Sequence, residues 1–198
     1  MFSTIRLRGF AIACVGLGVL ALAGVRAGEV PSIYTHDGQL VKPAAYREWV
    51  NIGTGLGMAY GPAREKAGAH PPFTNVFVSP ASYRGFLERG VWPEQTVFVL
   101  EIRRSVPVNA EGAGNGHYQG DLVAIEAEVK DSARFEKGWG FFNLPQDRES
   151  GAQIPTTASC YACHATNAAV ENTFVQFYPV LRDVAKQHRT FKDVATTF

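Results

Sequence analysis

Apolar and polar side chains alternate most regularly over residues 96–104, and a period of two predicts a β-strand with one buried face. Its apolar positions are Phe98, Leu100 and Ile102, and its polar positions include Glu101 and Arg103. A glycine-rich loop at 111–116 separates this stretch from a second predicted strand at 121–130. We expect the two strands to form an antiparallel pair with a long connection.

The patterns elsewhere predict shorter elements around this pair. A strand is expected at 76–78, a helix at 80–90 and a third strand at 139–144. From Ser159 onward the apolar period is helical, and Pro179 is expected to kink or interrupt that helix. The sum predicts an α+β fold in which an antiparallel β-sheet packs with helices, with no internal repeat.

The segment before the first strand is less regular. We expect an extended arm at 29–42 and a short helix or turn at 43–50. The stretch 53–72 is rich in Gly, Ala and Pro, which predicts an irregular loop.

The amino terminus has the pattern of a secretory signal peptide. Two arginines precede an apolar run at 10–23, and small residues follow up to Ala27. We expect cleavage after Ala27, export to the periplasm and a mature domain of residues 28–198. The run is shorter than the about 20 apolar residues that a membrane span needs, so we expect no span after signal removal. A lipidated Cys14 is the alternative, but little hydrophobic sequence precedes it.

The charge balance bears on the kind of partner. The chain has 19 basic and 18 acidic residues, for a net charge of +1. A field this weak argues against nucleic acid or an anionic membrane as the partner. We therefore expect small molecules and a periplasmic redox protein as partners.

Cys160, Tyr161, Ala162, Cys163 and His164 form one C-x-x-C-H motif, the sequence at which haem c is attached. Two thiols at this spacing bond to the vinyl groups on one edge of the porphyrin, and the next residue reaches the iron. The motif predicts one covalent haem c, held by Cys160 and Cys163, with His164 as the proximal iron ligand at the start of a carboxyl-terminal helix. A redox dithiol or half of a zinc site is the alternative. The dithiol would need a surrounding βαβ pattern, and the zinc site would need a second cysteine pair, which the chain lacks.

The sixth iron position decides whether a small molecule can bind. Small electron-transfer cytochromes supply a methionine after the haem motif, and none follows His164. Met58 lies in a glycine-rich stretch, where we expect a gap-filling residue, with axial ligation as the alternative. We expect surface positions for the other histidines, which are His36, His70, His117 and His188.

Five short motifs together resemble the cytochrome P-460 family over nearly all of the mature chain. They are Y-R-E-W-V at 46–50, G-N-G at 114–116, V-K-D-S at 129–132, C-Y-A-C-H at 160–164 and F-Y-P-V-L-R at 177–182. The resemblance implies an antiparallel sheet with helices, a periplasmic homodimer, and a c-type haem that is open on its distal side. Members of the family oxidise hydroxylamine, and the related cytochromes c′-beta mainly bind nitric oxide.

The resemblance also assigns roles to residues of the sheet. The family's cross-linking lysine, on a strand with the pattern T-V-x-V-K, corresponds to Leu100, which faces inward beside Phe98 and cannot form the cross-link. Glu126 matches the distal glutamate that relays protons, with an exposed strand glutamate as the alternative. Leu122 and Ala124 are expected on the face of Glu126, where partial burial would raise its pKa.

Aromatic residues are expected to shape the distal side. Phe73, Phe77 and Phe98 would crowd it and favour neutral diatomic ligands, with ordinary core packing as the alternative.

Two functions of different classes follow. The first is a haem protein that binds nitric oxide or a similar ligand, or transfers electrons, without turnover. The second is an oxidoreductase that acts on hydroxylamine or nitric oxide and uses Glu126 as its proton relay.

Overall fold

The computed structural model describes residues 33–58, 71–108 and 114–194. The predicted signal peptide at 1–27 with its cleavage site, and His70, lie outside these residues. Within the described part of the chain, no helix is both long enough and apolar enough to cross a membrane.

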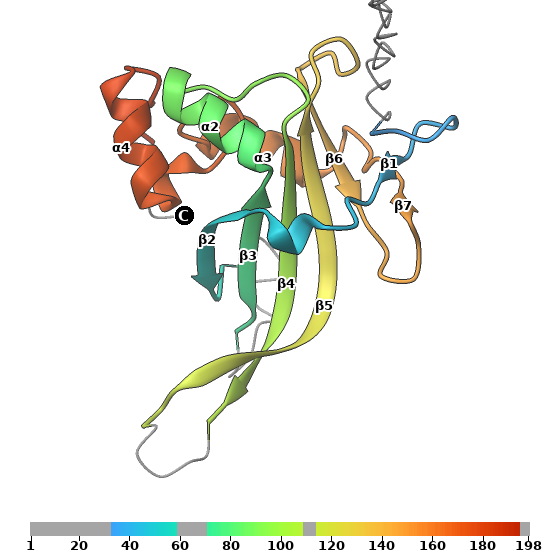
Figure 1. Ribbon diagram of the computed structural model, residues 1–198, viewed down its shortest axis with the longest axis vertical. Coiled ribbons are helices and arrows are strands. Elements are labelled where there is room, and N and C mark those ends of the chain that lie inside the picture. The colour runs from blue at the N-terminus through green and yellow to red at the C-terminus, as the bar shows by residue number, and fades with distance from the viewer. Residues whose placement is uncertain (1–32, 59–70, 109–113, 195–198) are drawn as a thin grey trace, which may run out of the picture. The chain divides into compact units, whose positions relative to one another are not determined.

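A five-stranded antiparallel sheet is the centre of the fold (Figure 1). Its strands follow one another in chain order, and each pairs antiparallel with the next. They are β2 (Val50–Leu56), β3 (Phe73–Val78), β4 (Val97–Pro107), β5 (His117–Lys130) and β6 (Trp139–Asn143). A second, two-stranded sheet pairs β1 (Leu40–Val41) with β7 (Ser150–Gly151). The predicted α+β class and the predicted antiparallel pairing of the two long strands are confirmed.

Helix α2 (Pro80–Arg89) begins and ends as its sequence predicts. The Ser79 hydroxyl accepts a hydrogen bond from the backbone N–H of Ser82, and Pro80 occupies the first turn, where its missing N–H costs nothing. The helix ends at Gly90, whose φ of 69° is left-handed.

The carboxyl-terminal region contains several short helices where one interrupted helix was predicted. Helix α3 (Ser159–Asn167) carries the C-x-x-C-H motif, and a turn then precedes the 3₁₀ helix η2 (Val175–Phe177) and helix α4 (Pro179–Gln187). Pro179 starts α4 in its first turn, so it begins a new helix instead of kinking an existing one.

The predicted loop at 53–72 is wrong in its first part, because β2 continues to Leu56. Its glycines indicated a loop, but they lie in a paired strand, with Gly53 opposite Val76 and Gly55 opposite Thr74. Just upstream, the predicted short helix is the 3₁₀ helix η1 (Tyr46–Glu48).

The two faces of the sheet bury different cores. One face packs against helices α2 and α4, and its core includes Val78, Phe86, Trp92, Phe98, Trp139, Val175 and Leu181. The opposite face packs against η1 and β1, and its core includes Leu40, Tyr46, Val97, Val99, Ile125, Phe135 and Phe142. Because side chains alternate along each strand, β3, β4 and β6 contribute to both cores, whereas the apolar side chains of β5 lie in the second core alone.

Glu101 is a buried carboxylate on the η1 side of the sheet, with only 2% of its surface exposed. Its oxygens accept hydrogen bonds from the Tyr46 hydroxyl, from Arg47 Nε at 2.7 Å and from Arg103 Nε at 2.7 Å. Burial alone would raise the pKa of Glu101, but the hydrogen bonds from Arg103 and Tyr46 and the arginine charges outweigh it and lower the pKa.

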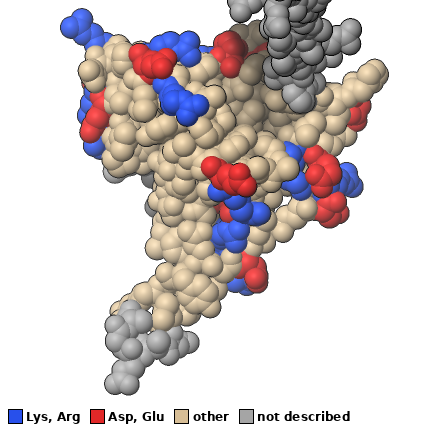
Figure 2. Space-filling view, in the orientation of Figure 1, with Lys and Arg blue, Asp and Glu red and all other residues tan. Residues whose placement is uncertain are grey.

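On the face that Figure 2 shows, charges of both signs lie in small mixed groups.

We predict that Glu101→Gln lowers the free energy of unfolding at pH 7 by about 2 kcal/mol, because two arginines lose a buried anionic partner. A carboxyl whose folded pKa is lowered stabilises the protein above its unfolded pKa of about 4.3, and that stability is lost as the pH falls through the folded pKa. The difference in the free energy of unfolding between wild type and variant, measured by denaturant unfolding, should therefore become smaller below about pH 4. Glu136→Gln, at an exposed position, is the control and should have little effect at either pH.

Candidate functional site

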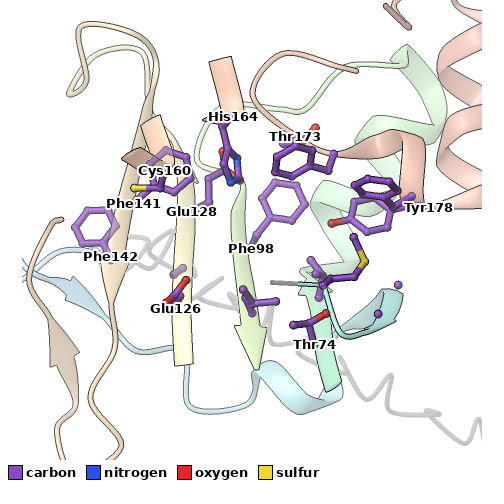
Figure 3. Close-up of a pocket in the computed structure, with 18 of the residues that line it drawn as sticks. Thr74, Phe98, Glu126, Glu128, Phe141, Phe142, Cys160, His164, Thr173 and Tyr178 are labelled. Carbon is purple, nitrogen blue, oxygen red and sulfur yellow. The ribbon is translucent and has the colours of Figure 1, made fainter. Parts of the chain in front are cut away.

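A cavity of about 190 Å³ lies on the sheet face that α3 approaches (Figure 3). All five strands of the large sheet contribute to its wall, together with α3 and the segment that follows it. Most of the lining is apolar, and the polar side chains that reach it include Thr74, Glu126, Glu128, His164, Thr173 and Tyr178.

The strand register arranges the cavity wall in rows. Phe98 lies opposite Glu128, and Glu128 lies opposite Phe141, which gives one row across β4, β5 and β6. Two residues further along β4, Leu100 lies between Val76 and Glu126, which gives the next row. The predicted shared face of Phe98 and Leu100 is therefore confirmed, and both residues line the cavity.

The three chemically distinctive residues of α3 are close together because they occupy one helical turn and the start of the next. Cys160 and Cys163 are free thiols of intermediate exposure. His164 follows directly, and its ring makes edge-to-face contacts with Phe141 at 4.6 Å and Phe174 at 4.5 Å between ring centroids. These contacts limit the movement of the imidazole, which lines the cavity.

A backbone carbonyl fixes the tautomer of His164. Its Nδ1 lies 2.7 Å from the carbonyl oxygen of Asn172, and a carbonyl only accepts, so Nδ1 carries the proton and donates it. The other ring nitrogen, Nε2, is then left with its lone pair. That arrangement is the usual one for a histidine that binds a metal.

Glu128 is a site residue that sequence analysis did not single out. Its side chain is 12% exposed, and its Oε1 is buried without a hydrogen-bond partner among the described residues, 3.5 Å from His164 Nδ1. Burial raises the pKa of Glu128, although the neighbouring histidine opposes this. The alternation that places Glu126 on this face also places Glu128 there, so the sequence pattern contained the signal.

Glu126 lines the same cavity from the next row. Its side chain is exposed, as the alternative interpretation held, yet the surrounding protein desolvates the carboxyl enough to raise its pKa, an effect that the charge of His164 opposes. Of its two expected neighbours, Leu122 packs in the opposite core instead, because the β4–β5 register shifts beside Arg103.

Several other predicted residues are now placed. Met58 lines the cavity just after β2. Phe77 was wrongly expected there: it contacts Tyr46 in the opposite core, with ring centroids 5.7 Å apart. Phe73 does not line the cavity, and His117 pairs with Ser105 Oγ at 2.8 Å near the far end of the β4–β5 hairpin.

These donors suit a haem better than a bare metal ion. Among the described residues, no three or more His, Cys, Asp and Glu side chains converge as a metal site. Two thiols and one imidazole with a free Nε2, at the edge of an apolar cavity, match instead the needs of a cofactor that brings its own equatorial ligands.

Comparison with known proteins gave one family match. The family model described as Cytochrome P460 matches residues 43–175, which is more than half of the chain. No curated protein matches the chain.

The glycines of β2 make room beside the cavity. A Cβ atom on Gly53 would lie 2.6 Å from Cδ1 of Tyr178, and one on Gly55 would lie 2.6 Å from Sδ of Met58. Both distances are too short for real contacts, so a larger residue here would push these side chains aside.

We predict that Gly53→Ala lowers the free energy of unfolding by about 2 kcal/mol through overpacking against the Tyr178 ring. Tyr178→Leu removes the ring atoms that the new methyl group would meet. In a double-mutant cycle followed by denaturant unfolding, Gly53→Ala should therefore cost less in the Tyr178→Leu background than in wild type. Equal costs in the two backgrounds would contradict the contact.

Proposed function

Because the chain belongs to the cytochrome P460 family, we propose that it is an exported c-type cytochrome whose single haem binds nitric oxide or a similar small nitrogen ligand. The family implies a haem cofactor. The main support for the other parts of the proposal is the His164 imidazole. Its Nδ1–H donates a hydrogen bond to the Asn172 carbonyl, and its Nε2 remains free.

In this proposal α3 supplies every bond from the protein to the cofactor. Cys160 and Cys163 would hold the porphyrin by thioethers, and His164 Nε2 would bind the iron. A bound haem would supply redox chemistry and a place for a small ligand. Phe141 and Phe174 keep the imidazole in place by packing against its ring, so ligand binding and release need not move it.

The cavity wall supports a neutral ligand. By the resemblance, Leu100 corresponds to the family's cross-linking lysine, and its register partners are Val76 and Glu126. An aliphatic side chain has no nucleophile for a porphyrin cross-link. It also offers no charge or hydrogen bond to a bound molecule, which favours small neutral ligands such as nitric oxide over charged ones.

A second candidate function is the oxidation of hydroxylamine, and one observation favours it. Glu126 lies in the cavity beside Leu100, with a pKa raised by desolvation. A carboxyl whose pKa moves toward neutrality exchanges protons more readily at physiological pH. In this role Glu126 would accept protons from the bound substrate, and an outside redox protein would accept the electrons.

The proposed setting is the periplasm, with a redox protein as partner and a homodimer as the assembly. The amino-terminal charged and apolar pattern of residues 1–27 supports export. The net charge of +1 supports partners other than nucleic acid.

We predict that the purified protein carries one haem that acidified acetone does not extract. Intact mass spectrometry should show the mass of residues 28–198 plus one haem. Cys160→Ala or Cys163→Ala should each remove one thioether bond, whereas Cys14→Ala, in the predicted signal peptide, should leave the mature mass unchanged. His164→Ala should alter the absorption spectrum of the attached haem. A wild type that loses its haem to acetone would contradict the proposal.

The two candidate functions differ in turnover. We predict that the reduced holoprotein binds nitric oxide and carbon monoxide, and that hydroxylamine with an electron acceptor gives no sustained acceptor reduction. Sustained reduction would favour the second function. In that case Glu126→Gln should lower the rate by about 100-fold or more, because a proton relay is lost, while the exposed control Glu136→Gln keeps it.

A further inference from the structure

The turn that follows α3 holds the carbonyl group that fixes His164. Val170 and Thr173 bridge this turn by two backbone hydrogen bonds, of 3.3 Å from Val170 N–H and 2.8 Å from Thr173 N–H. The Thr173 hydroxyl adds a third bond by donating to the Val170 carbonyl at 2.8 Å. Asn172, whose carbonyl accepts from His164, therefore lies at the tip of a closed four-residue turn.

The turn has a backbone conformation that needs outside support. Glu171 has a φ of 51°, in the left-handed region that residues with a side chain adopt only at a cost. Glycine or asparagine would be the usual residue there. A glutamate in this place suggests that its side chain contributes something that offsets the strain.

Two residues outside the turn hold Glu171 and Thr173, the residues on either side of Asn172. Lys130 Nζ, at the end of β5, lies 2.5 Å from Glu171 Oε1 and also donates to the Trp92 carbonyl at 2.8 Å. The Trp92 backbone N–H donates to Glu171 Oε2 at 3.3 Å, and its indole Nε1–H donates to the Thr173 hydroxyl at 2.9 Å. Trp92 is 1% exposed, so these contacts belong to the core of the protein.

A competing acceptor explains why the turn must be held. Glu128 Oε1 is buried, accepts no well-aligned hydrogen bond from the described residues, and lies 3.5 Å from His164 Nδ1, within ion-pair distance (Figure 3). If the Asn172 carbonyl moved away, a small rotation of the imidazole would turn Nδ1–H toward this carboxyl group. A carboxyl group would then replace an amide carbonyl as the acceptor, and as a carboxylate it would make the imidazole a stronger donor to iron.

We propose that Lys130, Glu171 and Trp92 are positioning residues for the proximal histidine: they hold the 170–173 turn so that His164 donates to Asn172 and not to Glu128. This inference rests on the proposed function, in which His164 binds the haem iron. All three residues act on the turn, and their effect passes through the Asn172 carbonyl.

The test compares two carboxylates that share Lys130. Glu171 lies on the turn, whereas Glu94 lies off it, 3.9 Å from Lys130 Nζ, with hydrogen bonds to Ser132. Glu171→Ala and Glu94→Ala each remove one carboxylate near Lys130, but only the first releases the turn. The readouts are the iron–histidine stretching frequency of the ferrous holoprotein in resonance Raman spectra and the haem midpoint potential.

We expect Glu171→Ala to raise the stretching frequency and lower the midpoint potential, and Glu94→Ala to match wild type. Trp92→Phe is the second variant in case Glu171→Ala does not fold, because it keeps an aromatic ring in the core and removes the indole donor to Thr173. It should shift both readouts in the same direction. Wild-type values in Glu171→Ala and Trp92→Phe, or an equal shift in Glu94→Ala, would overturn the positioning role.

The experiments distinguish a failure of the proposed function from a failure of the positioning role. A wild-type protein without covalent haem by intact mass overturns that function and this inference with it. A wild-type protein with covalent haem and unresponsive variants overturns the positioning role alone.

Discussion

The hydrogen bond between His164 Nδ1 and the Asn172 carbonyl is the contact on which the arrangement of the site depends. It joins α3 to the turn that follows it, and it decides which ring nitrogen stays free. The aromatic contacts of Phe141 and Phe174 restrict the ring, but they do not select a tautomer. A single main-chain acceptor thus fixes the tautomer of a histidine packed among aromatic rings and leaves its Nε2 free.

Two carboxyl groups on opposite faces of the central sheet differ in their hydrogen bonding. Glu101 has three side-chain donors around it and contributes to stability. Glu128, on the face that lines the cavity, has a buried oxygen with no hydrogen-bond partner among the described residues. An unsatisfied buried acceptor destabilises a fold, so its presence is more typical of a functional site than of a structural core.

The sequence predicted the features that depend on the pattern of apolar and polar side chains. The period of two between Phe98 and Leu100 correctly gave the face that lines the cavity, and the resemblance to the family is confirmed by the family match over 43–175. Strand β2 was missed because its glycines, which make room for Tyr178 and Met58, have the composition of a loop. The role of Asn172 could not be predicted, because a main-chain carbonyl acts there and any residue would supply one.

The order of the elements along the chain separates the assembly of this fold into two stages. All five strands of the central sheet end by Asn143, before the first residue of α3 is synthesised. The bond between His164 and Asn172 joins residues eight positions apart, whereas the contact of Lys130 with Glu171 spans 41 positions. Helix α3 and its turn can therefore form locally and late, and they close onto a sheet whose cavity wall already exists. The thiols and the lining segment that follows them are thus the last parts of the cavity wall to be synthesised, which leaves this side of the cavity open until the carboxyl-terminal region has folded.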